Sequence, residues 1–343
     1  MEFGRTQHIE EINFSLPPDD PMNELLWQRL AREEQPAANL EHQPAATTQN
    51  STTAARHPTR LHVGCTQWGR ADWVGKVYPR ETKQKDFLAQ YVKQFNCIEL
   101  NTLFYGLQPR PVIERWASLA DDEFRFCPKL SESISHKSQL RNAAQETALF
   151  VDHVSAFGSR LGPSFLQLSE SFSPDRANVL QDYLRSLPKD FQLCLELRHK
   201  DWFTSKDGFN AAGAKSPDNA AFAGASKDTY ALLMEQGLGT VITDTAGRRD
   251  VLHMRLTAPV VFIRWIGNSL HPTDLVRLEE WAHRLKSWMD KGLREIYFII
   301  HNHDELYAPD LAAHAVERFN AICGTMLKPP KLLSPEPPPL TLF

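Results

Sequence analysis

Charged and amide side chains recur at the ends of short apolar runs in this sequence. Glu196 and Arg198 lie in the run 192–198, where Leu193, Leu195 and Leu197 alternate with them. Side chains of a strand alternate between its two faces, so the leucines suit one face, packed on helices, and the charged residues belong to the other. This second face is expected to point into the interior. The same alternation assigns to it further polar residues near the ends of other runs: Glu99, Asn101, Lys129, Gln167, Asp244 and Arg264. We therefore expect these polar groups to gather at one end of a common sheet.

Such a set favours acid–base chemistry on a polar, anionic ligand. Arg198, Arg264 and Lys129 would attract phosphate or carboxylate groups, as found in phosphorylated sugars, nucleotides or a nucleic-acid backbone. Glu196 and Glu99 would serve as general acid or base, with His199 as a proton carrier, and these three are the predicted catalytic residues. The predicted ligand-binding residues are Trp68, Asn101, Tyr105, Lys129, His136, Gln167, Arg198, Trp202, Asp244, Arg264, Asn302 and His303. For a catalytic Glu196, we expect Glu196→Gln to be at least as stable as the parent.

Three alternatives stay open. Glu99, Glu196 and Asp244, with His199, His301 or His303, would form a divalent-metal site of the kind found in barrel isomerases and repair endonucleases. A module that binds nucleic acid or a metabolite without turnover would use the aromatic residues for stacking. The charges could also pair only with one another and stabilise the fold. The preferred interpretation requires no metal or cofactor, and the sequence has no Walker loop, dinucleotide-binding turn or nucleophile elbow.

The elements that must position these residues follow from the pattern of apolar residues. Eight runs of strand length lie at 61–65, 97–101, 124–129, 164–168, 192–198, 240–244, 260–266 and 296–300. Most are separated by segments of helical period, at 85–95, 112–120, 143–157, 179–187, 275–289 and 311–322. This alternation predicts an α/β fold, a single, somewhat irregular TIM-like (β/α)8 barrel over residues 60–327. Residues 204–226 indicate a long, mobile insertion.

The two ends of the chain have a different composition from the barrel region. Residues 1–59 are rich in Gln, Ala, Thr and Pro and are expected to be a mostly disordered tail, dispensable for folding. Within it, residues 21–34 have a helical pattern that either docks on the barrel or a partner or forms only transiently. Residues 328–343 contain many prolines and are expected to be extended.

Charge and cysteine content limit the setting in which the protein works. The net charge of −4 gives no global attraction to nucleic acids or anionic membranes, so such contacts would need a local basic patch. No apolar run reaches the length of a membrane span, and no secretion signal is found. Five cysteines without close pairs suit a reducing compartment. We expect a cytoplasmic protein with no membrane partner; its oligomeric state stays open.

Several ordered motifs resemble one known family. They are Gly64–Trp68, Asp72–Gly75, Tyr78-Pro79, Glu99–Tyr105, Phe124–Lys129, Ser135-His136, Glu196–Phe203 and Arg264–Gly267. Together they are similar to the family called domain of unknown function 72, or YecE-like, over nearly all of residues 61–323. The resemblance implies a TIM-like barrel and no particular chemistry. The sequence departs from the family pattern at Gln67, where glycine is usual, and at Ile300-His301-Asn302, where Phe-Asn-Asn is usual.

Overall fold

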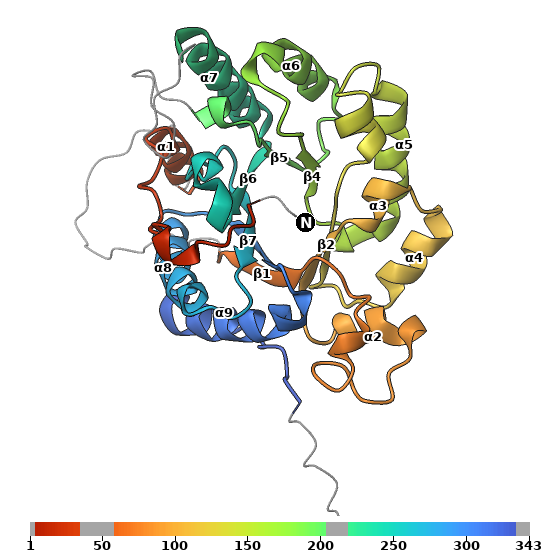
Figure 1. The fold of residues 1–343 in the computed structure, drawn as a ribbon. Coiled ribbons are helices and arrows are strands. Elements are labelled where there is room, and N and C mark those ends of the chain that lie inside the picture. The colour runs from red at the N-terminus through yellow and green to blue at the C-terminus, as the bar shows by residue number, and fades with distance from the viewer. Residues whose placement is uncertain (1–3, 35–57, 204–218, 334–343) are drawn as a thin grey trace, which may run out of the picture.

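Eight parallel strands form a nearly closed barrel in the computed structural model, which describes residues 4–34, 58–203 and 219–333. The strands are β1 (Arg60–Cys65), β2 (Cys97–Leu100), β3 (Arg125–Pro128), β4 (Ser164–Gln167), β5 (Leu193–Glu196), β6 (Gly239–Asp244), β7 (Val260–Gly267) and β8 (Glu295–Asn302). Their order is β3-β2-β1-β8-β7-β6-β5-β4. Isolated bridges from Phe126 to Leu161 and from Lys129 to Phe165 join β3 to β4. All eight predicted strands are present, and the TIM-like barrel is confirmed (Figure 1).

Alternation along the strands separates two apolar clusters. The barrel interior is filled by Cys97, Cys127, Phe165, Cys194, Val241, Phe262, Tyr297 and Ile299. The opposite strand faces, including Leu193, Leu195 and Leu197, belong to a larger cluster shared with the surrounding helices. Apolar side chains therefore fill the middle of the barrel, and polar residues of the same inward parity follow them at the strand ends.

Helices surround the sheet (Figure 1). In chain order they are α1 (Asn23–Glu33), α2 (Phe87–Tyr91), α3 (Thr102–Tyr105), α4 (Arg110–Ser118), α5 (Ala144–Val154), α6 (Ala177–Ser186), α7 (Asn219–Gln236), α8 (Pro272–Asp290) and α9 (Ala308–Cys323). Between β6 and β7 the chain forms only a short 3-10 helix, Ala246–Val251. No helix of the described residues is long and apolar enough to cross a membrane.

The helix expected over residues 21–34 is present as α1, and it packs into the core. Leu26, Trp27 and Leu30 are buried in the main apolar cluster. The side chain of Asn23 donates to the Met254 carbonyl oxygen at 2.7 Å and accepts from the Leu256 amide at 2.8 Å. Of the alternatives left open for residues 21–34, the structure shows the helix docked on the barrel. The apolar face of this amphipathic helix is buried, although the average composition of residues 1–59 is that of a tail.

The residues before α1 lie along the rim of the barrel. The Gly4 carbonyl oxygen accepts a hydrogen bond from the Gly247 amide at 2.8 Å. Arg249 donates to the carbonyl oxygens of Phe14 and Ser15. Asp19 accepts from Trp288 at 2.9 Å and pairs with Arg284 and Lys291. Figure 1 shows this segment in red, on the side of the barrel formed by β6, β7 and α8.

Removing the buried leucine of α1 is expected to destabilise the whole barrel. Leu30 is 1% exposed, whereas Leu25 of the same helix is 53% exposed. Leu30→Ala should lower the free energy of unfolding by about 2 to 5 kcal/mol, because it deletes buried methyl groups and leaves a cavity. Leu25→Ala, the matched control, should change it by less than about 0.5 kcal/mol. Urea denaturation of the full chain measures both. Equal small effects would show that α1 is not part of the cooperative fold.

The insertion expected at residues 204–226 and the C-terminal residues 328–343 are described only in part. Of the insertion expected at 204–226, residues 204–218 lie outside the described residues, and the remainder belongs to α7. Alanine, the strongest helix former, is frequent in that remainder, in agreement with its helical conformation. At the C-terminus, residues 328–333 have no helix or strand. The Lys331 amide donates to Gln94 and the Leu333 amide to the Lys76 carbonyl oxygen, and residues 334–343 lie outside the described part.

Candidate functional site

Arg264 of β7 lies between two carboxylates at the C-terminal end of the barrel. Its Nε and Nη2 donate to Glu99 of β2 at 2.8 and 2.9 Å, and its Nη1 donates to Glu196 of β5 at 3.2 and 3.1 Å. All three side chains are fully buried. Paired guanidinium–carboxylate contacts of this kind are strong and directional. Because every donor nitrogen of Arg264 is engaged, this residue joins three strands rather than offering donors to a ligand.

The partners of the two carboxylates hold both in the ionised form. Glu196 also accepts from Arg198 Nε at 2.6 Å, Gln167 Nε2 at 2.8 Å and Thr243 Oγ1 at 3.1 Å. Burial opposes ionisation, but Arg198, Arg264 and the Gln167 hydrogen bond outweigh it and lower the pKa of Glu196 to about 2. Burial likewise opposes ionisation of Glu99, and its cationic partners hold its pKa well below the usual range. Both carboxylates are therefore charged at neutral pH.

Lys129, directly after β3, has no carboxylate partner among the described residues. Its Nζ donates to the amide oxygen of Gln167 at 2.8 Å and lies 3.9 Å from the centre of the Phe104 ring. The side chain is largely buried, and the residue is 6% exposed. Burial first, and then the positive charge of Arg264, lower the pKa of Lys129 to about 8. A substantial fraction of this lysine is thus neutral in mildly alkaline solution.

A cavity of about 750 Å³ opens beside Lys129 at the ends of β1, β2 and β3. It is lined by Thr66, Gln67, Trp68, Gly69, Glu99, Leu100, Asn101, Thr102, Tyr105, Gly106, Gln108 and Lys129. Asn101 is held in place by donating to Glu99 Oε1 at 2.9 Å. Trp68 packs edge-on against Trp116, and Tyr105 is 81% exposed at the rim. The cavity has the size and mixed lining of a small-molecule site.

A second, smaller cavity of about 230 Å³ adjoins the first. Thr66, Gln67 and Asn101 line both cavities, and the smaller one is completed by Ile266, His301, Asn302, His303 and Glu305. His301 of β8 contacts Glu99 Oε2 through its Nε2 at 3.0 Å, which links this cavity to the buried charge network. The two cavities therefore form one strand-end site, defined here as the residues that line either of them.

Glu305 is a titratable group of this site whose pKa lies near neutral pH. Its Oε1 accepts from Thr66 Oγ1 at 3.2 Å, while its Oε2 is inaccessible to solvent and has no hydrogen-bond partner among the described residues. Burial raises the pKa of Glu305 to about 7, because the Thr66 and Asn302 hydrogen bonds compensate only in part. A carboxyl group with this pKa exchanges protons readily at neutral pH.

The sequence did not identify Glu305 as a candidate. It lies in the loop after β8, outside any strand, so strand alternation carries no information about it. His301 entered the sequence analysis only as a metal-ligand alternative, and Thr66 only within a family motif. The sequence nevertheless contained a signal for this site. His301, His303 and Glu305 follow the last predicted strand, 296–300, and the loops after barrel strands build active sites.

The structure does not bring Asp244 into the site. The side chain pairs with Arg249 and with Arg277 of α8 at 3.0 Å, and it accepts from Trp281 Nε1 at 2.7 Å. Thr243, its neighbour, reaches Glu196 instead. The assignment of Asp244 to the inner face was therefore wrong. Val241 and not Ile242 faces the interior, which places Thr243 inside and Asp244 toward the helices.

Two other predicted residues are engaged elsewhere. Trp202 is buried, and its Nε1 donates to the Phe172 carbonyl oxygen at 2.7 Å, so it packs in the core instead of lining the cavity. His199 accepts from the Asp201 amide at 3.3 Å and shapes the turn after β5. Neither lines the strand-end site. Both lie just beyond β5, where the chain turns back toward the core.

The remaining predicted residues lie around the site. His136 Nδ1 and Ser135 Oγ share a hydrogen bond of 2.8 Å. The His136 ring packs edge-on against Phe104, with centroids 5.2 Å apart. Asn302 accepts from the Ser269 amide at 3.0 Å and lines the smaller cavity with His303. Burial first, and then the nearby Arg5 of the N-terminal segment, lower the pKa of His303. The N-terminal rim segment thus lies near enough to His303 to influence it electrostatically.

The residues of the alternative metal site do not converge. Arg264 separates the carboxylates of Glu99 and Glu196 and occupies their oxygens, while Asp244 points toward α8. A metal site would need these oxygens to be directed at a common point. Within the described ranges, no group of three or more His, Cys, Asp or Glu side chains is arranged to hold an ion.

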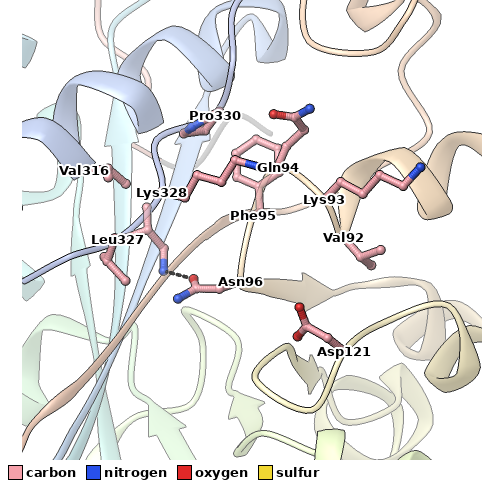
Figure 2. Close-up of a pocket in the computed structure, with 11 residues that line it drawn as sticks. Val92, Lys93, Gln94, Phe95, Asn96, Asp121, Val316, Leu327, Lys328 and Pro330 are labelled. Atoms are coloured by element: carbon pink, nitrogen blue, oxygen red, sulfur yellow. Dashed lines mark hydrogen bonds between the residues drawn. The ribbon is translucent and has the colours of Figure 1, made fainter.

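Another pocket lies at the opposite, N-terminal ends of β2 and β3 (Figure 2). Asn96, at its centre, uses its amide to accept from the Val63 amide at 2.7 Å and to donate to the Leu61 carbonyl oxygen at 3.0 Å. Leu327, Lys328 and Pro330 of the C-terminal segment line one side. This face of a barrel contributes to stability rather than catalysis, and the bonds of Asn96 match that role.

Comparisons with known proteins agree with this architecture. Residues 62–334 match the family described as protein of unknown function DUF72. The protein YecE of Escherichia coli strain K12 is 28% identical over 260 residues, which cover 73% of this chain and 89% of YecE. The protein YunF of Bacillus subtilis is 26% identical over 153 residues, 42% of this chain and 52% of YunF.

Solved structures of the same family share the fold. A DUF72 family protein from Thermotoga maritima aligns with a TM-score of 0.56 and 20% identity, covering 77% of this chain and 99% of that protein. One from Enterococcus faecalis aligns with a TM-score of 0.56 and 17% identity, covering 79% and 100%. With the barrel, the strand-end motifs and a family match over most of its length, this chain belongs to the DUF72 family of proteins of unknown function.

Proposed function

We propose that the strand-end site belongs to a metal-independent enzyme that acts on a small, anionic, oxygen-rich ligand such as a phosphorylated sugar or a nucleotide. The observation that carries this proposal is Lys129: a buried cation that lines a large cavity and has no carboxylate partner among the described residues. A structural lysine in such surroundings would normally be paired. An anionic group of a ligand would supply the missing counter-charge.

The neighbouring residues would divide the work. Thr66, Asn101 and Tyr105 offer hydroxyl and amide groups around the cavity, suited to the oxygens of a sugar or phosphate. Arg264, with Glu99 and Glu196, would hold the strand ends in register and keep Asn101 and Gln167 in position. Trp68 would provide an apolar wall.

Proton transfer is assigned to Glu305. A general acid or base works best when its pKa lies near the working pH. The pKa of Glu305 is about 7, whereas that of Glu196 is about 2, which makes Glu196 a weak base at neutral pH. Glu196 and Glu99, the carboxylates singled out by the sequence, would then act by positioning other groups.

Glycerol 3-phosphate is expected to raise the melting temperature of the wild-type protein, because a ligand that binds only the folded state stabilises it. At about 100 times its dissociation constant it contributes about 2.7 kcal/mol. Lys129→Met should abolish the shift, whereas Lys85→Met, which removes an exposed lysine, should leave it unchanged. A thermal-shift titration of each folded variant measures this. An undiminished shift in Lys129→Met would exclude Lys129 from the binding site. Binding without conversion of any phosphorylated ligand would favour the non-catalytic alternative.

A further inference from the structure

We propose that Lys129 is a nucleophile that forms an imine with an aldehyde or ketone substrate bound in the larger cavity. This inference rests on the proposed function, because it places a carbonyl group in the same ligand that carries the anion. It narrows the substrate class to carbonyl compounds and assigns Lys129 a covalent role.

The surroundings of Lys129 make the neutral amine more accessible than it is in an ordinary lysine. Its hydrogen-bond acceptor, Gln167, is an uncharged amide, and the nearest carboxylates, Glu99 and Glu196, are already neutralised by arginines. The charged and titratable groups that act on Lys129 are Arg264, Glu196, Glu99, Arg198 and His136, whose ring also packs on Phe104. Burial and the two arginines outweigh the carboxylates, and together they lower the pKa of the amine to about 8. Desolvation beside other cations activates lysines that form imines.

The geometry also provides space and a proton carrier. Lys129 lines the cavity of about 750 Å³, so a small carbonyl compound bound there lies beside this lysine. The His136 ring packs on the same Phe104 ring and is oriented by Ser135. Burial first, and then the charge of Lys129, lower the pKa of His136, which leaves its imidazole neutral and able to accept a proton at neutral pH.

The step balances without a further reagent. The nitrogen lone pair of Lys129 forms a bond to the carbonyl carbon, and the π electrons of the carbonyl move to its oxygen. His136 takes a proton from the nitrogen and returns it to that oxygen, which gives a carbinolamine. The carbon–oxygen bond then breaks, and the hydroxyl leaves as water with the second nitrogen proton. The resulting imine, once protonated, withdraws electrons from the adjacent carbon and eases proton removal there.

The difference between a pKa of about 8 and the ordinary 10.5 predicts a large reactivity difference. At pH 7 the free-amine fraction of Lys129 should exceed that of an ordinary lysine about 300-fold, since one pKa unit corresponds to a factor of ten. Even with the lower intrinsic nucleophilicity of a weaker base, Lys129 should react with carbonyl compounds at least about 10-fold faster than an exposed lysine such as Lys85.

Borohydride trapping tests this inference. The full chain is incubated at pH 7 with dihydroxyacetone phosphate or with glycolaldehyde, reduced with sodium borohydride, and mapped by peptide mass spectrometry. The expected result is a reduced adduct on Lys129 that is at least 10-fold more abundant than on Lys85. Glycerol 3-phosphate, which has no carbonyl group, should suppress labelling by dihydroxyacetone phosphate and form no adduct. Lys129→Met should lose this adduct and retain the minor ones.

The outcomes separate this inference from the proposed function. Adducts confined to exposed lysines with both probes, in a wild-type protein that glycerol 3-phosphate still stabilises, would overturn the imine and leave anion binding intact. A Lys129 adduct with glycolaldehyde, in a protein that no phosphate compound stabilises, would support the nucleophile and refute the anionic ligand. Because the adduct is mapped in the wild-type chain, the result does not depend on whether Lys129→Met folds.

Discussion

Glu305→Gln is expected to stabilise the protein at pH 8 and to have little effect at pH 5. The folded-state pKa of Glu305 is about 7, above its ordinary value of 4.5, so the folded state holds this proton more tightly than the unfolded state does. A carboxyl group with a raised pKa stabilises the folded state only in its protonated form. The free energy of unfolding therefore falls as the pH rises from 4.5 to 7. The difference of 2.5 pKa units corresponds to about 3 kcal/mol at pH 8 and less than about 1 kcal/mol at pH 5.

Urea denaturation at the two pH values measures this difference. Glu146→Gln, which changes an exposed glutamate of α5, is the matched control and should have the same small effect at both. A Glu305→Gln variant with equal stability gain at pH 5 and pH 8 would contradict the assigned protonation. Any activity found for the protein should be lost in this variant, since active-site groups are kept at a cost in stability.

Glu196→Gln is expected to have the opposite effect, a loss of about 3 to 5 kcal/mol at neutral pH. The substitution leaves Arg264 and Arg198 buried beside a neutral amide, and removing one partner of a buried ion pair typically costs this much. The sequence alone favoured a variant at least as stable as the parent. The observed set of four donors on one carboxylate reverses that expectation.

The pH dependence provides an independent check. Because the pKa of Glu196 is lowered to about 2, its contribution to stability is present above pH 4.5 and is lost as the pH falls through 2. Acid unfolding of Glu196→Gln should therefore show a weaker pH dependence between pH 4.5 and 2 than that of the wild type. Glu170→Gln, which breaks an exposed pair with Arg248, should cost less than about 1 kcal/mol. Equal losses of unfolding free energy in Glu196→Gln and Glu170→Gln would show that the buried ion pairs contribute no more to stability than an exposed one.

Strand alternation predicted most of the buried network. It assigned Glu99, Lys129, Gln167, Glu196 and Arg264 to the interior, and the structure brings these five residues together. It failed at Asp244, because Val241 and Ile242 are both apolar and the sequence does not distinguish the inward one. Parity can be read from a strand only where one face differs from the other in polarity.

Strand alternation carries no information about the positions of side chains in loops and terminal segments. Glu305 begins a short 3-10 helix, Glu305–Tyr307, in the connection after β8. The course of this connection depends on tertiary contacts, among them the hydrogen bond from Trp73 Nε1 to the Glu305 carbonyl oxygen. The docking of α1 depends on apolar residues from distant parts of the chain, so the local pattern predicted the helix but did not decide whether it docks. The ion pair of Asp19 with Arg284 and the hydrogen bond from Trp288 Nε1 to Asp19, both to α8, form only once the barrel is assembled.

We propose that the strand-end site around Lys129 binds an anionic ligand. A crystal structure of the full chain with saturating glycerol 3-phosphate tests it most directly. We expect a phosphate group within hydrogen-bonding distance of Lys129 Nζ, inside the cavity bordered by Thr66, Asn101 and Tyr105. An empty strand-end site, with the ligand bound instead in the pocket near Asn96 or on surface lysines, would contradict it.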